Sequence, residues 1–234
     1  MSVISIYTEN IKSNFDELIV LELYGSGTGI FSMRSYIYIM LYNIIPVYIL
    51  CGFYEYCKTH INLAVKIRFG SRTKWLNKIN KTAINFIILY IFVTILVYII
   101  TSFVFTRDIE LNKNSVELLK GTPMVNTPII NIIIKFVISK FLEMLFIFLF
   151  ILLIDTFTKS TIIDFILIVI GHIINLFPLK FMVYNPMGIS FLGRQIYNEN
   201  ARTLTYSEII ITLFIYIFFV LVILNLRKSM IFND

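Results

Sequence analysis

Apolar blocks long enough to cross a lipid bilayer dominate this sequence. Hydrophobic residues make up 58% of its 234 positions and charged residues 15%, whereas a soluble domain is about half apolar and about a quarter charged. The mean hydropathy is +0.85, and the apolar residues form continuous runs rather than amphipathic stripes. Because runs of about 18 or more apolar residues are typical of transmembrane helices, we predict an all-α membrane protein, a polytopic helical bundle.

Five segments are predicted to span the membrane: residues 35–53, 83–105, 128–154, 161–178 and 208–226. Pro46 should break the first span, and the third is too long for one perpendicular crossing at about 1.5 Å per residue. Residues 1–34 are predicted to form an outer-face or partly inserted N-terminal segment. Its helix, at residues 15–24, should end at Gly25. Residues 35–234 then form the transmembrane domain.

A dense basic hinge joins the first two predicted spans. Residues 58–81 contain seven cations: Lys58, Lys66, Arg68, Arg72, Lys74, Lys78 and Lys81. Lys and Arg beside membrane ends stay on the cytoplasmic side, so the hinge is predicted to orient the chain. This orientation places the N-terminus and the loops 106–127 and 179–207 outside, and the turn 155–160 and the tail 227–234 inside. Ten Lys and Arg then lie on each side, so the density of cations in one short loop decides the orientation.

The motifs of soluble enzymes find no support in the sequence. The glycine cluster Gly25-Ser-Gly-Thr-Gly29 is not followed by the Gly-Lys-Ser/Thr signature of a phosphate-binding loop, so we expect any ATP hydrolysis in a separate chain. No Ser/His/Asp, Cys/His or HExxH pattern is present, and no catalytic residue, cofactor or metal is predicted. Cys51 and Cys57 are expected to be packing residues. Cations at membrane edges explain the net charge of +6, so nucleic acid is not an expected partner.

Within the hinge, the chain is predicted to turn back at Gly70. Residues 61–69 alternate between apolar and polar side chains, which is typical of a strand, but they also permit a helix that continues from the first span. We favour the helix. Ser71 can cap a second helix with Trp75 on its apolar side. The hinge would then form an elbow of two helices joined by a tight Gly-Ser turn.

This elbow resembles that of a known transporter family. The segment Val65-Lys-Ile-Arg-Phe-Gly-Ser-Arg-Thr-Lys-Trp75 is similar to the cytoplasmic elbow of type-two ATP-binding-cassette (ABC) exporter permeases, and closest to those of bacteriocin or toxic-peptide export and immunity. In that family the elbow is a coupling helix in a groove of a separate ATPase subunit. The resemblance implies that coupling is carried here by Arg68, Phe69, Ser71, Arg72, Lys74 and Trp75.

The resemblance covers residues 35–230 and implies further properties. These are a multi-pass location in the bacterial cytoplasmic membrane, a separate ABC ATPase as partner, and a second permease that is either another copy or a different chain. Residues 185–200 would form an outer re-entrant region with backbone breaks at Pro186, Gly188 and Gly193. The family usually has six spans with a cytoplasmic start, and we expect this chain to lack the first of them.

Polar residues recur within the third and fourth spans. Asn131, Lys135, Ser139 and Glu143 share one helix face in the third, and charges inside a span often mark a pathway. We therefore predict that they line a translocation pathway; alternatively, the overlong helix starts in water outside the bilayer. Lys140 and Glu143 can also pair, since they lie three residues apart.

In the fourth span, Asp164 and His172 are compatible with a proton relay, although packing or a helix–helix hydrogen bond is the favoured interpretation. The expected function is the permease subunit of an ATP-driven ABC transporter that exports amphipathic or antimicrobial peptides, or gives immunity to them. Two alternatives are a non-transporting membrane immunity or scaffold subunit, and an ion-coupled carrier that uses Asp164 and His172.

Overall fold

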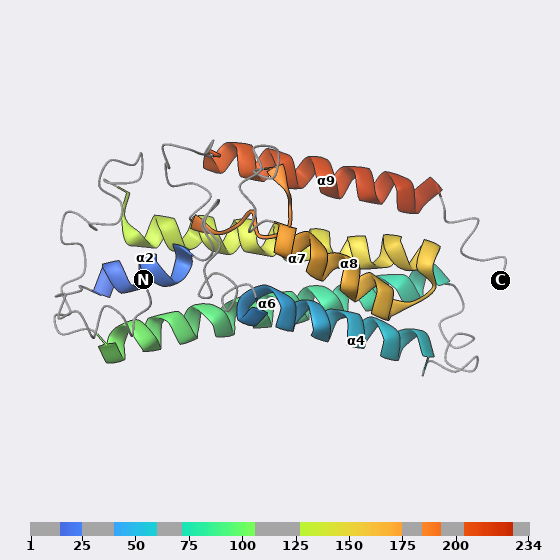
Figure 1. Ribbon diagram of the computed structural model, residues 1–234, viewed down its shortest axis with the longest axis horizontal. Helices are drawn as coiled ribbons and strands as arrows, with labels where there is room; N and C mark the ends of the chain where they lie inside the picture. The colour runs from blue at the N-terminus through green and yellow to red at the C-terminus, as the bar shows by residue number, and fades with distance from the viewer. Residues whose placement is uncertain are drawn as a thin grey trace.

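The protein is a bundle of α-helices. A computed structural model (Figure 1) describes residues 15–24, 40–59, 72–105, 127–174, 184–192 and 204–226. The helices in these residues are α2 (Phe15–Tyr24), the π-helix η1 (Met40–Ile44), α4 (Ile45–Thr59), α6 (Arg72–Phe105), α7 (Ile129–Thr158), α8 (Thr161–Ile174) and α9 (Tyr206–Leu226). These ranges contain no β-strand. The all-α prediction is confirmed.

Helix α7 lies at the centre of the bundle. It packs against α9, α8, α6, α4 and α2, and in Figure 1 α9 runs along one side of it while α6 and α4 run along the other. Within the most apolar stretch of each helix, 67% of α7 is buried, against 28% of α6 and 22% of α9. A helix that is apolar all round belongs in a core, and α7 forms most of the core here.

The outward faces of α6 and α9 are apolar. Large exposed side chains on them include Phe92, Phe103, Phe214, Phe218 and Leu226, and soluble proteins rarely expose apolar surface on this scale. In the described part of the chain, three stretches are long and apolar enough to cross a membrane: Asn77–Val104, Ile129–Thr158 and Tyr206–Leu226. The chain is therefore a helical membrane bundle.

The two other predicted spans are described in part. The first corresponds to η1 and α4, which follow each other directly from Met40 to Thr59, and its residues 35–39 lie outside the described residues. The fourth corresponds to α8, whose 14 described residues rise about 21 Å. The 30 residues of α7 rise about 45 Å, so the prediction of an overlong third span is confirmed.

Pro46 marks the junction of η1 and α4. Proline has no N–H, so the carbonyl of Tyr42, four residues earlier, lacks the donor that a regular helix would supply. The hydroxyl of Tyr90 in α6 donates a hydrogen bond to this carbonyl instead. The predicted break at Pro46 therefore takes the form of a π-helical segment whose freed carbonyl is satisfied by a neighbouring helix.

The described cations gather at one end of the bundle. Helices α4, α7 and α9 end there, and α6 and α8 begin there (right side of Figure 1); we call this the basic end. Of the eight described Lys and Arg, six lie near it: Lys58, Arg72, Lys74, Lys78, Lys81 and Lys159. Lys135 lies toward the opposite end and Lys140 midway along α7. This distribution favours a cytoplasmic position for the basic end.

The predicted helix at residues 15–24 is confirmed as α2. It lies toward the end opposite the basic end (Figure 1) and packs on α6 and α7. Its buried apolar residues are Leu18, Ile19, Val20 and Leu23, so α2 is an integral part of the bundle. Residues 1–14 and 25–34 of the predicted N-terminal segment, and residues 60–71 of the hinge, lie outside the described residues.

Candidate functional site: a buried polar cluster

A buried ion pair occupies the middle of α7. Lys140 Nζ lies 2.9 Å from Glu143 Oε1, and the two side chains are 3% and 0% exposed. Helical spacing of three residues places both on one face, and the predicted pairing is confirmed. Glu143 is 14 residues from the start of α7, about 21 Å along its axis and close to its midpoint.

Two other elements complete the coordination of this pair. Lys140 donates a hydrogen bond to Oδ1 of Asn43, which belongs to η1, and its ammonium lies 5.1 Å from the ring centre of Phe191. The second carboxylate oxygen of Glu143 accepts the backbone N–H of Ser190 at 3.0 Å. The irregular segment 184–192 is therefore held against the middle of α7 through its backbone.

His172 of α8 faces the same cluster. It is 1% exposed and lies within electrostatic reach of both Glu143 and Lys140. Its Nδ1 is 3.0 Å from the carbonyl oxygen of Ile168. Because a carbonyl only accepts, Nδ1 carries a proton, so in the neutral ring Nε2 is an acceptor. Nε2 has no hydrogen-bond partner among the described residues.

The cluster is costly to build, which points to a specific role. Charged side chains inside a membrane protein are rare and usually pair with one another. Removing one partner of a buried pair typically costs about 3–5 kcal/mol, because the other charge is left uncompensated. Asn43, Lys140, Glu143, Ser190 and His172 come from four different elements, so the cluster forms only when those elements are assembled.

The cluster contains polar atoms that can exchange hydrogen bonds or a proton. No group of three or more His, Cys, Asp or Glu side chains that could hold a metal occurs in the described part of the chain. Within that part, Asn43 Nδ2, Ser190 Oγ and His172 Nε2 are buried without a hydrogen-bond partner. Buried polar atoms are normally paired, so these three are the atoms at which the cluster can engage a ligand or a proton.

The four residues predicted to line a pathway occupy different surroundings along α7. Asn131 is exposed and Ser139 is buried, donating to the Lys135 carbonyl of its own helix at 2.8 Å. Lys135 lies 5.6 Å from the ring centre of Tyr206 at the start of α9. Glu143 is in the ion pair. None of the four lines the apolar groove between α8 and α9 that is described below.

The predicted coupling residues are described only in part. Arg68, Phe69 and Ser71 lie outside the described residues, and α6 begins at Arg72. Lys74 is exposed in the first turn of α6, the turn that also contains Trp75.

The described part of the predicted re-entrant region, residues 185–192, contains no α-helix and is buried apart from the half-buried Asn185. Pro186 and Gly188 lie within it, and Gly188 has a φ of 82°, a left-handed value that favours glycine. Irregular backbone at membrane depth is tolerated only where protein or water surrounds it, and here the segment is covered by the bundle. Gly193 lies outside the described residues.

A second polar network lies at the basic end. Lys58 is 2.8 Å from Asp155 Oδ1, and the hydroxyl of Tyr54 donates to the other oxygen of Asp155 at 2.9 Å. Thr158 donates to Asp164 at 2.6 Å. This network joins α4 to the α7–α8 turn. Asp164 thus belongs to the basic end and His172 to the buried polar cluster, so the structure does not bring the two together.

Two members of the cluster were not expected from the sequence. Asn43 could have been noticed, because it is a lone amide within an apolar run. Ser190 acts through its backbone N–H, which every residue except proline has, so its side chain carries no signal of this role.

Comparisons of the chain with protein-family models, with curated proteins and with solved structures find no match.

Proposed function

We propose that this chain is the membrane-spanning permease subunit of an ATP-driven ABC transporter in the bacterial cytoplasmic membrane. It would export amphipathic or antimicrobial peptides, or give immunity to them. A separate ABC ATPase supplies the energy, and a second permease, either another copy or a different chain, completes the transporter.

The observation that carries this proposal is the continuity of α6. Lys74, Lys78 and Lys81 are exposed in its first three turns at the basic end, and the same 34-residue helix continues for about 51 Å as a membrane span. Exposed cations suit docking on an acidic groove of an ATPase. A movement of the docked ATPase at the basic end would therefore be transmitted to the opposite end of the bundle along one continuous helix.

Packing around α6 supports transmission of that movement. Ile79, Ala83, Ile87 and Ile91 are buried on one side of α6 within the main apolar core, which also contains much of α7. Helix α7 in turn contacts α8 and α9. In the proposed mechanism, ATP-driven closure of the ATPase pair tilts α6, the spans rock as rigid bodies, and access to the space between the two permeases alternates.

A second candidate function is a non-transporting immunity or scaffold subunit. It is favoured by the burial of Ser139, Lys140 and Glu143, whose charges and hydroxyl are paired within the protein instead of facing a water-filled passage. Such a subunit would need the cluster for stability alone.

Co-purification tests the proposal. The chain should retain an ABC ATPase after extraction in mild detergent, and the Lys74→Glu/Lys78→Glu/Lys81→Glu variant should lose it. The matched control is Lys113→Glu/Lys120→Glu, which reverses charge in the loop predicted on the opposite side. Retention of the ATPase by the triple variant, or equal loss in both variants, would contradict docking at α6. If the chain still protects cells from a toxic peptide when all ABC ATPases are deleted, the non-transporting immunity or scaffold subunit would be favoured.

A further inference from the structure

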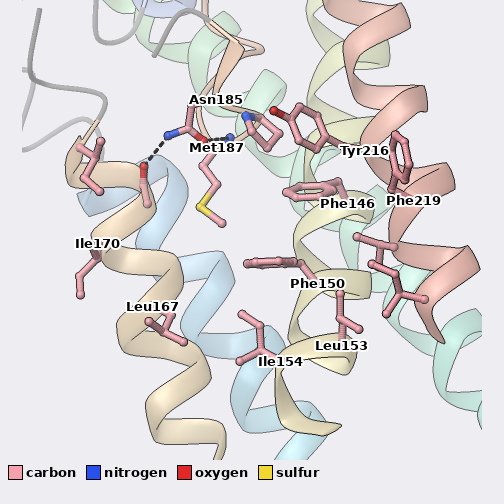
Figure 2. A pocket seen from close by; sticks show the side chains of 15 residues that line it. Phe146, Phe150, Leu153, Ile154, Leu167, Ile170, Asn185, Met187, Tyr216 and Phe219 are labelled. Atoms are coloured by element: carbon pink, nitrogen blue, oxygen red, sulfur yellow. Dashed lines mark hydrogen bonds between the residues drawn. The ribbon is translucent and has the colours of Figure 1, made fainter. Parts of the chain in front are cut away.

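An apolar groove of about 520 Å³ lies between α8 and α9, with α7 as its floor. Figure 2 shows Phe146 and Phe150 on α7, Leu167 and Ile170 on α8, and Phe219 on α9 around the opening. At its upper end in this view the segment Asn185–Met187 closes it: Asn185 Nδ2 donates to the carbonyl of Gly171 at 2.8 Å, and the Met187 side chain points into the gap.

The groove opens toward lipid rather than toward water. Its α8 and α9 walls include Leu167, Ile170 and Phe219, which are exposed on the outer surface of the bundle. Helix α9 is long and apolar enough to span a membrane, and α8 is a shorter apolar helix. A void of this size would forfeit the dispersion contacts of all its lining atoms, so in a bilayer it fills with whatever apolar group is available.

The groove is short. It follows α7 from Phe146 to Ile154, about 12 Å at 1.5 Å per residue. A single alkyl chain, which is one methylene wide, fits this space.

The position of the groove along the bundle selects the head group. Its deepest residues toward the basic end are Ile154 on α7 and Ile223 on α9. The exposed Lys159 follows Ile154 by five residues, and in the sequence Arg227 and Lys228 follow directly after α9. A cation at this level, as Lys159 is, attracts the anionic head groups of the cytoplasmic leaflet.

We propose that this groove binds one acyl chain of an anionic phospholipid, with the head group at the basic end. The inference does not depend on the transporter proposal, since it concerns only the faces of α7, α8 and α9. It makes the lipid a bound component that separates α8 from α9 over the inner half of α7.

Photo-crosslinking of the purified chain in nanodiscs tests this site. The probe is phosphatidylglycerol with a diazirine in its acyl chain, and mass spectrometry locates the label. The expected label is on α7, α8 or α9 peptides that line the groove. Ile223→Trp and Leu167→Trp, which fill the groove from its two walls, should each lose most of that label.

Matched controls distinguish the groove from the general lipid shell. Leu221→Trp on α9 and Ile166→Trp on α8 place the same side chain at exposed positions that do not line the groove, so they should retain the label. Two wall variants are used so that the test still gives a result if one of them fails to fold. Equal labelling of wall and control variants would overturn the site. Equal labelling by a phosphatidylcholine probe would overturn the head-group assignment. Cross-linking between two copies of the Ile223→Cys variant would overturn the lipid as occupant in favour of a second chain.

Discussion

Neutralising Glu143 should destabilise the bundle far more than neutralising a surface acid. In Glu143→Gln the carboxamide can still accept the Ser190 N–H, but it no longer balances the Lys140 charge, which is 3% exposed. Removing one partner of a buried pair costs about 3–5 kcal/mol. For a chain of this size that corresponds to a fall in Tm of roughly 10 °C.

The double variant Lys140→Met/Glu143→Gln isolates the electrostatic part of this loss. It removes both charges while keeping the acceptor for Ser190, and replacing a buried pair by neutral groups of similar volume is often harmless. Asn43 Oδ1 loses the donor that it has in Lys140, so a residual loss of about 1–2 kcal/mol should remain. Most of the stability should therefore return.

Thermal unfolding in detergent can be followed with a thiol-reactive dye, because Cys51 and Cys57 are both free and buried. Glu208→Gln is the control: Glu208 accepts hydrogen bonds from the N–H and hydroxyl of Thr205 in a capping box at the start of α9, and Gln serves in the same motif. Its Tm should stay within about 2 °C, as for surface changes. A Glu143→Gln variant as stable as the native chain, or a double variant no better than the single one, would refute the reasoning.

Two further substitutions test local packing with the same assay. Tyr90→Phe removes the donor to the Tyr42 carbonyl and should cost about 1–3 kcal/mol, the penalty of an unpaired buried acceptor; the exposed Tyr48→Phe should be neutral, and equal effects would contradict the role given to Tyr90. Gly171→Ala would bring its Cβ into a clash with Sδ of Met187, so overpacking should cost about 1 kcal/mol after the flexible thioether moves. Gly52→Ala meets no atom within 4 Å and should be neutral or stabilising, so a Gly171→Ala variant as stable as this control would show that the clash is absent.

The sequence predicts the helices well where one strong signal dominates. The apolar run that became α9 and the span within α6 follow from hydropathy alone, because no other structure satisfies the backbone in lipid. The bounds of α2 also match, since Gly25 provides a helix stop. The predicted fourth span, 161–178, is described as far as Ile174, where the bounds of α8 stop, and its last four positions lie outside the described residues.

Only those contacts of the candidate site that are close in sequence could be predicted. Lys140 and Glu143 are close in sequence, so helical spacing alone predicts their pairing. Asn43 and Ser190 are 97 and 47 residues away from the groups that they contact, and such contacts depend on how the elements pack. The carboxylate near His172 is that of Glu143, which is on α7 and not on α8. Helical spacing within α8 therefore could not reveal it.

The attachment of Ser190 to Glu143 also sets an order for biogenesis. Residues 184–192 contain no continuous helix, so in lipid they cannot satisfy their own polar backbone. They can move from the membrane surface into the bundle only after α7 has been inserted, because Glu143 on α7 accepts the Ser190 N–H. Helix α8 must also be in place, because the carbonyl of Gly171 accepts a hydrogen bond from Asn185. Closure of this segment is therefore a late step of assembly in the bilayer, and a nascent chain released before that point would still have this stretch at the membrane surface.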